Sequence, residues 1–236
     1  MSTATPRLIL GCPLWAEPAW CGALYSSGAD ADRRLHEYGQ VFGAVEGNTT
    51  FYALPERDTV RRWAELLPAD FHFCAKLPRE ISHADVLDPQ HPLLTRFFHT
   101  MAPLEQRLGP VWLQLPARFG PAQLPQLATF LQALPEGGRY AVEVRHPDFF
   151  RKDDNERRLN RMLFERGMER IMFDSRGLFA SPDQDSATLD ARRRKPRLPV
   201  HALALADRPT VRFIAGMDNQ QSLRWLAPWL DKCRQW

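Results

Sequence analysis

The feature that most constrains the fold is a regular alternation of short apolar runs with longer amphipathic stretches. The apolar runs are short enough to be buried strands, and the stretches between them carry apolar residues at helical spacing. The predicted strands are 8–11, 44–48, 71–76, 111–115, 140–145, 171–174 and 210–214. Strands that alternate with helices are typical of parallel sheets built from repeated βα units. The pattern therefore predicts an α/β fold, specifically a TIM-type parallel (β/α) barrel.

The chain has 236 residues, and barrels of this type commonly use about 250 residues as one domain. We therefore predict a single domain over residues 1–236. The segment 175–209 is mostly polar and contains the basic run Arg192, Arg193, Arg194 and Lys195. We predict that this segment is a solvated, mobile loop rather than a phosphate-binding arm.

Composition excludes several classes of protein. The four cysteines show no CxxC spacing, so neither a disulfide framework nor a zinc ribbon is expected. No GxGxxG or GxSxG motif follows a predicted strand, so no nucleotide cofactor and no serine hydrolase is expected. Residues 1–6 do not resemble a signal peptide, and no run has membrane-spanning length. We therefore expect a cytoplasmic protein without membrane partners.

Parallel strands are expected to be apolar on both faces, but the strands predicted here carry polar side chains at or near their ends. These residues are Glu46, Asn48, Lys76, Gln114, Glu143, Arg145, Asp174 and Arg212. Because side chains alternate along a strand, Glu46 shares a face with Asn48, and Glu143 shares one with Arg145. Phe173 and other apolar neighbours are expected on the opposite face, under helices. In a closed barrel the polar side chains would gather at the carboxyl-terminal mouth, where barrel enzymes keep their active sites.

The chain resembles the YecE-like family, catalogued as domain of unknown function 72 (DUF72), over nearly its whole length. The shared motifs are EGNTTFY at 46–52, KLP at 76–78 with His83 beyond it, QLP at 114–116 and EVRH at 143–146. The spacing of Gly11, Trp15, Trp20 and Gly22 is similar too. The resemblance implies a TIM-like barrel and no settled activity. Likeness of the family to sugar-isomerase-like and endonuclease IV-like barrels suggests phosphoester chemistry or nucleic-acid binding, by analogy only.

The chain departs from the family pattern in two places. Family members usually carry histidine and glycine after the arginine of strand seven, whereas here Phe213 follows Arg212. The family also continues into an eighth strand and a closing helix, but only seven βα units are readable before Trp236. We therefore expect a barrel that is short at its carboxyl terminus.

The first functional hypothesis is an enzyme, hydrolase or isomerase-like, that acts on an anionic sugar- or phosphate-containing molecule. Lys76, Arg145 and Arg212 would hold the anion, and Glu46 or Glu143 would act as general acid or base. The proposed catalytic set is Glu46, Glu143, Lys76 and Asp174. The proposed substrate-binding set is Asn48, Tyr52, His83, Gln114, Arg145, His146 and Arg212.

The same residues are also compatible with other functional hypotheses. A glycosidase would use Glu46 and Glu143 as its two carboxylates. A divalent metal held by Glu46, Glu143, Asp174 and His146 is disfavoured, because the neighbouring cations would repel it. The second class of function is a non-catalytic nucleic-acid or nucleotide-binding protein, supported by the run Arg192–Lys195 and by Trp15 and Trp20. An ion-pair network without any ligand is the purely structural alternative.

Overall fold

The structure, a computed structural model, describes residues 7–236 of the chain. The prediction made for residues 1–6 lies outside the described residues. The chain divides into two compact units, which we describe separately. The amino-terminal unit comprises Ile9–Gln114 and Pro125–Ala141, and the carboxyl-terminal unit comprises residues 7–8, Leu115–Leu124 and Val142–Trp236. The single domain therefore stays a prediction.

Parallel strands form the centre of the amino-terminal unit. They are β1 (Gly11–Cys12), β2 (Ala44–Gly47), β3 (His72–Ala75) and β4 (Val111–Gln114). β1 pairs with β2 and β2 with β3, and the Leu77 N–H donates to the Trp112 carbonyl at 2.9 Å. A Cβ at Gly11 would lie 2.2 Å from the Ala44 carbonyl oxygen, so β1 can approach β2 this closely only with glycine there.

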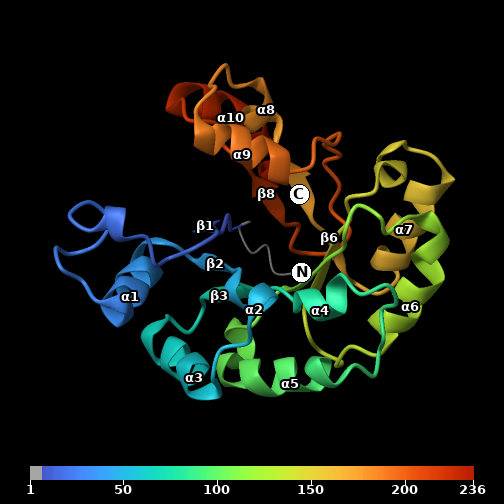
Figure 1. Cartoon of the computed structure of the whole chain (residues 1–236), viewed down its shortest axis with the longest axis horizontal. Coiled ribbons are helices and arrows are strands. Elements are labelled where there is room, and N and C mark those ends of the chain that lie inside the picture. The colour runs from blue at the N-terminus through green and yellow to red at the C-terminus, as the bar shows by residue number, and fades with distance from the viewer. Residues whose placement is uncertain (1–6) are drawn as a thin grey trace. The chain divides into compact units, whose positions relative to one another are not determined.

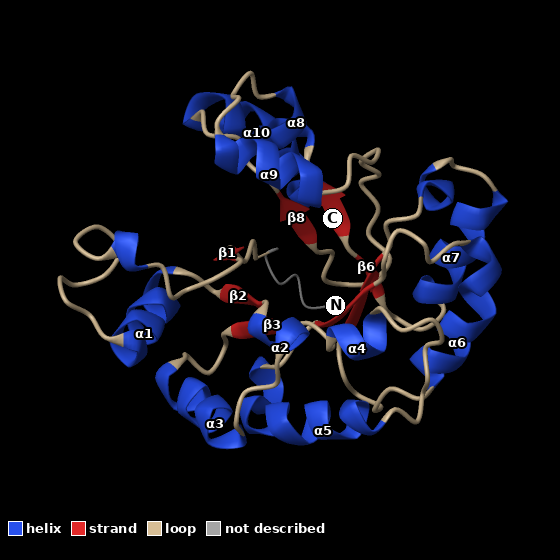
Figure 2. Cartoon of the chain, in the orientation of Figure 1, coloured by secondary structure: helices blue, strands red, loops and turns tan. Residues whose placement is uncertain are grey.

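The helices of this unit flank its strands (Figure 1, Figure 2). They are η1 (Pro18–Trp20), α1 (Ala31–Val41), α2 (Thr49–Tyr52), α3 (Arg57–Leu66), α4 (Arg79–Ser82), α5 (Pro92–Met101), η2 (Ala102–Arg107) and α6 (Leu124–Gln132). Asp30 caps α1 by accepting from the Arg33 N–H at 2.8 Å. The Phe73 ring stacks on Trp63 of α3 with centroids 5.0 Å apart, so this face of β3 is covered by a helix as expected.

The carboxyl-terminal unit contains the end of β5 (Tyr140–Glu143), with β6 (Glu169–Arg170), β7 (Met172–Asp174) and β8 (Val211–Phe213). The Ile171 N–H donates to the Val142 carbonyl at 2.9 Å, and β7 pairs with β8 in parallel. The predicted strand 171–174 corresponds to β7, while the short strand β6 before it was not predicted. The helices are η3 (Pro121–Gln123), η4 (Pro147–Phe150), α7 (Asp154–Phe164), α8 (Arg176–Ala180), α9 (Ser186–Arg194) and α10 (Asn219–Gln235).

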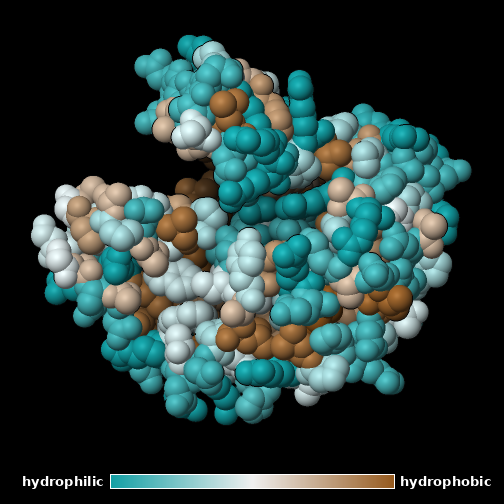
Figure 3. Space-filling view, in the orientation of Figure 1, coloured by the Kyte–Doolittle hydropathy of each residue, from teal (hydrophilic) through white to brown (hydrophobic). Residues whose placement is uncertain are grey.

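The prediction of a loop over 175–209 is wrong, because α8 and α9 lie within this segment. Asp185 caps α9 by accepting from the Thr188 N–H at 2.9 Å. The Arg192 guanidinium donates to the carbonyls of Leu178 and Asp183 at 3.2 and 3.0 Å, which ties α9 to the chain before it. Figure 3 shows a largely hydrophilic surface over α8, α9 and α10.

The α/β class with parallel strands is confirmed, but the closed barrel is not. Among residues 7–236 the strand pairings form separate short sheets and no closed ring, so the barrel stays a prediction. Within the same residues, no helix combines the length and apolar character needed to cross a membrane.

Candidate functional site

Lys76 is the centre of a polar group in the amino-terminal unit. Its side chain follows β3 and is only 3% exposed, although lysine is rarely buried. The ammonium lies 2.8 Å from Glu46 Oε1, 2.7 Å from Asn48 Oδ1 and 3.1 Å from Gln114 Oε1. The structure therefore brings together the four residues that the sequence predicts at the ends of strands two, three and four.

The Lys76 ammonium has several partners within the protein. Of these three contacts, those to Asn48 and Gln114 are hydrogen bonds, and the one to Glu46 is an ion pair. The Lys76 ammonium also lies 4.8 Å from the centroid of Trp112, at cation–π distance. Lys76 thus contacts Glu46, Asn48 and Gln114 at once, and the roles in catalysis and anion binding predicted for it stay predictions.

Two other predicted residues of this unit lie near α2. Phe51 is buried, and the ring of His83 meets it edge-on with centroids 5.3 Å apart. The His83 Nδ1 is 3.0 Å from the Ser82 hydroxyl. Tyr52 is 74% exposed and its ring packs edge-on against Phe51, so the structure does not bring it to the Lys76 group.

Glu143 is the centre of a second polar group, in the carboxyl-terminal unit. Its side chain is fully buried at the end of β5. Arg145 donates from Nε at 2.7 Å and from Nη2 at 2.6 Å to Oε1, and Arg212 Nη1 lies 3.5 Å from Oε2. Both guanidinium groups lie over the Phe173 ring, at 6.0 and 5.2 Å from its centroid. A buried carboxylate is thus fixed in orientation by two cations.

The expected direction of Asp174 is wrong. In the β7–β8 register Phe173 pairs with Arg212, and Asp174 pairs with Phe213. Because paired residues share a face, Phe173 lies on the side of Arg212, and Asp174 lies on the opposite side of the sheet. Asp174 instead accepts from Arg176 Nε and Nη2 at 3.0 and 2.8 Å and from the Trp229 indole of α10 at 2.7 Å.

The contacts of Asp174 determine the pKa of its carboxyl group. Burial would raise the pKa of this carboxyl, but the hydrogen bonds from Arg176 and Trp229 outweigh burial and lower the pKa below its usual range. The carboxylate is therefore the form that the fold requires. Its contacts with Arg176 and α10 indicate a role in holding α10 in place, and the catalytic role predicted for Asp174 stays a prediction.

Replacing Trp229 with phenylalanine is expected to lower the free energy of unfolding by about 1.5–3 kcal/mol, because it removes a donor to a buried charge. Since the pKa of Asp174 is lowered in the fold, the indole contact stabilises the protein above pH ~4, the pKa of an unfolded aspartate. The difference in the free energy of unfolding between Trp229→Phe and the unsubstituted protein should therefore shrink as the pH falls through the lowered pKa of Asp174. Urea unfolding between pH 7 and pH 3 measures this deficit. Trp236→Phe, which changes an exposed indole with no hydrogen bond to Asp174, is the control. A loss of stability in Trp229→Phe that does not depend on pH would contradict the assignment.

His146 follows Arg145 and is the N-cap residue of η4. Its Nδ1 accepts from the Asp148 N–H at 3.2 Å, so the neutral ring carries its proton on Nε2. A Cβ at Gly120 would lie 3.1 Å from that Nε2, which shows how closely the chain passes over the ring. The structure thus gives His146 a helix-capping contact.

Sequence reasoning missed three residues of these groups. Trp112 lies under Lys76, Phe173 lies under Arg145, and Arg176 binds Asp174. Trp112 lies two positions before Gln114 but carries no signal of its own. The expectation that Phe173 lies on the helix-covered face, away from the polar side chains, is wrong, because the register pairs it with Arg212. Within residues 7–236, no three histidine, cysteine, aspartate or glutamate side chains gather in a way that would hold a metal ion.

Comparison with known proteins identifies relatives over almost the entire chain. Residues 9–236 match the family model described as "Protein of unknown function DUF72". The UPF0759 protein YecE of Escherichia coli strain K12 is 44% identical over 229 residues, which is 97% of this chain and 82% of that protein. The same protein of Escherichia coli O157:H7 is also 44% identical, with the same coverage.

Two solved structures show the same fold at low sequence identity. A DUF72 family protein of Enterococcus faecalis has a TM-score of 0.69 and 18% identity, over 96% of this chain and 85% of that one. A DUF72 family protein of Thermotoga maritima has a TM-score of 0.68 and 20% identity, over 96% and 86%. The relationship predicted from the motifs is therefore confirmed, and the chain belongs to the DUF72 family.

Proposed function

We propose that the protein is an enzyme that acts on a small anionic molecule containing a sugar or phosphate, with Glu143 as general acid or base. The observation that carries the proposal is the fully buried Glu143 carboxylate with two guanidinium groups on it. Burying a charge costs several kcal/mol before pairing offsets it. Such an arrangement at the end of a strand, where α/β proteins keep their chemistry, supports a functional site.

Each side chain of this group has a distinct role in the proposal. The hydrogen bonds from Arg145 and Arg212 fix the carboxylate of Glu143, so that it can exchange a proton with a bound hydroxyl group. Arg145 contacts Glu143 through Nε and Nη2, which leaves the N–H groups of Nη1 for an oxyanion of the substrate. The Phe173 ring supports both guanidinium planes from below.

The other predicted features enter the proposal in different ways. The substrate contacts predicted for Glu46, Asn48 and Gln114 belong to the amino-terminal unit and stay predictions. The closed TIM-type barrel and the single domain are part of the proposal, and a crystal structure of the chain tests both. Nucleic-acid binding has weaker support, because Arg192, the first residue of the basic run, is used within the fold.

The test begins with a ligand screen and ends with a variant. Phosphorylated sugars are screened by thermal shift, because a ligand that binds only the native state raises the melting temperature. Glu143→Gln is expected to keep the shift and to lower turnover of the hit by about 10²–10⁴-fold, the usual contribution of a general acid or base. Arg145→Gln should lose the shift.

Arg157→Gln is the matched control, since Arg157 forms an exposed ion pair with Asp154 on α7. It should change neither the thermal shift nor turnover. Unchanged turnover in Glu143→Gln would remove Glu143 from the mechanism. A hit whose thermal shift survives in Arg145→Gln would show that the anion binds elsewhere.

A further inference from the structure

A pocket of ≈ 440 Å³ lies beside α8 in the carboxyl-terminal unit. We call it the α8 pocket. Its lining residues are Ser175, Arg176, Phe179, Ala180, Arg197, Leu198, Pro199 and Trp225. The volume is within the range of about 300–1,000 Å³ that small-molecule sites occupy. None of these residues was a predicted site residue.

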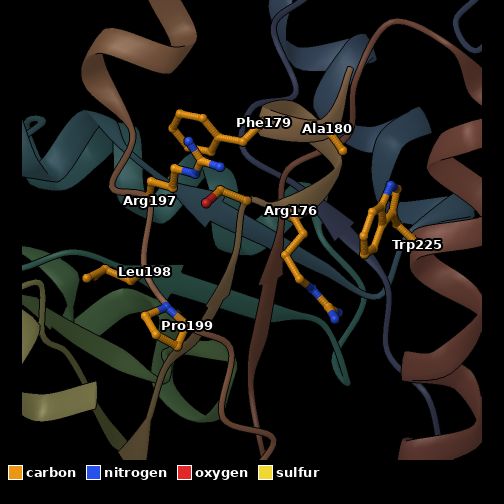
Figure 4. Close-up of a pocket in the computed structure, with 8 residues that line it drawn as sticks. Arg176, Phe179, Ala180, Arg197, Leu198, Pro199 and Trp225 are labelled. Atoms are coloured by element: carbon orange, nitrogen blue, oxygen red, sulfur yellow. The ribbon is translucent and has the colours of Figure 1, made fainter. Parts of the chain in front are cut away.

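Two arginine–aromatic pairs form the walls of this pocket. The Arg176 guanidinium lies 5.1 Å from the Trp225 ring centroid, and the Arg197 guanidinium lies 5.5 Å from that of Phe179. Figure 4 shows Arg176 and Trp225 on one side and Arg197 and Phe179 on the other. Guanidinium groups stacked on rings give flat cationic surfaces, which suit both a planar ring and an oxyanion.

The two arginines differ in what already holds them. Arg176 uses Nε and Nη2 on Asp174, so this guanidinium is fixed in place while Nη1 remains for a ligand. Arg197 forms no ion pair with any carboxylate among residues 7–236. The α8 pocket therefore combines one fixed cation with one cation that can meet an anion without losing a protein partner.

Other contacts show that the pocket walls are built by the fold. Trp225 packs against α8, because a Cβ at Gly177 would lie in ordinary van der Waals contact with the indole, at 3.5 Å. The buried Ser175 hydroxyl donates to the Pro196 carbonyl at 2.8 Å, which fixes the chain just before Arg197. Both walls are thus held by packing and hydrogen bonds.

We propose that the α8 pocket binds an aromatic oxyanion, a small molecule that combines a planar ring with a phosphate or carboxylate group. The ring would lie against Trp225 and Phe179, and the oxyanion would accept from Arg197 and Arg176. This site is separate from the Glu143 group. Arg176, which lines the pocket, binds Asp174. Asp174 lies on one face of the β7–β8 pair, and Arg212, which contacts Glu143, lies on the other.

Isothermal titration calorimetry of the full chain tests the proposal with four probes. AMP supplies a ring with phosphate, 4-hydroxybenzoate a ring with carboxylate, adenosine a ring alone, and ribose 5-phosphate a phosphate alone. AMP or 4-hydroxybenzoate, or both, is expected to bind about tenfold or more tightly than adenosine and ribose 5-phosphate. The reason is that adenosine lacks the oxyanion and ribose 5-phosphate lacks the planar ring. Whether AMP or 4-hydroxybenzoate binds distinguishes phosphate from carboxylate.

Variants locate the binding. Arg197→Gln is expected to weaken binding of the better probe by about tenfold or more, because it removes a charge-assisted contact. Arg193→Gln is the matched control, because Arg193 is an exposed arginine of α9 outside the pocket. Glu143→Gln should also leave Kd unchanged, whether or not Glu143 is catalytic.

Three outcomes would overturn the inference. The first is that neither AMP nor 4-hydroxybenzoate binds more tightly than adenosine and ribose 5-phosphate. The second is that Arg193→Gln weakens binding as much as Arg197→Gln does, which would indicate a general electrostatic effect. The third is that Glu143→Gln abolishes binding, which would place the ligand at the Glu143 group instead.

Discussion

Replacing Lys76 with methionine is expected to lower the free energy of unfolding by about 3–5 kcal/mol. Methionine fills a similar volume, so the main change is the loss of the ammonium beside Glu46, 2.8 Å away. The carboxylate of Glu46 would then lose a cation in a largely buried place, while the amide oxygens of Asn48 and Gln114 would lose a donor. Urea unfolding at pH 7, followed by tryptophan fluorescence, measures the loss.

A double-mutant cycle separates pairing from packing in this group. The combination of Lys76→Met and Glu46→Gln removes both charges and should recover a large part of the stability that Lys76→Met loses. Arg62→Met is the exposed control, because Arg62 pairs with Asp32 at 2.9 Å on the surface and should contribute far less. Strictly additive losses in the double variant would show that Lys76 and Glu46 are not coupled.

Replacing Arg170 with methionine is the second large effect that we expect, again about 3–5 kcal/mol. Arg170 is buried and donates to Glu156 Oε1 at 2.9 Å, to Asn160 at 2.8 Å and to the Phe149 carbonyl at 2.6 Å. The same Glu156 oxygen lies 2.6 Å from His201 Nδ1. Removing Arg170 thus leaves a buried carboxylate with fewer partners and removes the bonds that hold α7 and η4 to β6.

The titration of Glu156 gives this prediction a pH dependence. Burial would raise the pKa of Glu156, but hydrogen bonds from His201 and Lys152 and the charge of Arg170 lower it instead. The stabilising charge is therefore present above pH ~4.3, the pKa of an unfolded glutamate, and is lost as the pH falls through the lowered pKa. The deficit of Arg170→Met should accordingly be large at pH 7 and smaller in acid.

Two further variants make the Arg170 result specific. Arg170→Met combined with Glu156→Gln should be more stable than Arg170→Met alone, because the carboxylate is gone. Arg157→Met removes an exposed arginine from α7, 2.8 Å from Asp154, and should have little effect. If Arg170→Met is no less stable than Arg157→Met at pH 7, the buried network does not contribute as described.

Much of the strand arrangement was predictable because apolar runs and helical spacing are local properties of the sequence. The grouping of Lys76 with Glu46, Asn48 and Gln114 was predictable for a related reason. The carboxyl ends of neighbouring parallel strands meet at one edge of a sheet, so polar residues at those ends come together. The pairing of Glu143 with Arg145 follows from alternation along a single strand.

The helices α8 and α9 were missed because their segment is rich in charge and proline, which is typical of loops. A local signal was present, since Asp185 precedes Ser-Ala-Thr and caps α9 through the Thr188 N–H. The use of Arg192 on backbone carbonyls could not be foreseen, because it depends on where the preceding turn passes.

The sequence by itself determined the α/β class, the approximate strand positions and the chemical types of side chain at the strand ends. Only the tertiary structure decided which way Asp174 points and which aromatic rings lie under the cations. Alternation divides a strand into two faces without saying which face meets which neighbour. The register between β7 and β8 sets that choice, because pairing Phe173 with Arg212 turns Asp174 away from Glu143 toward Arg176 and Trp229.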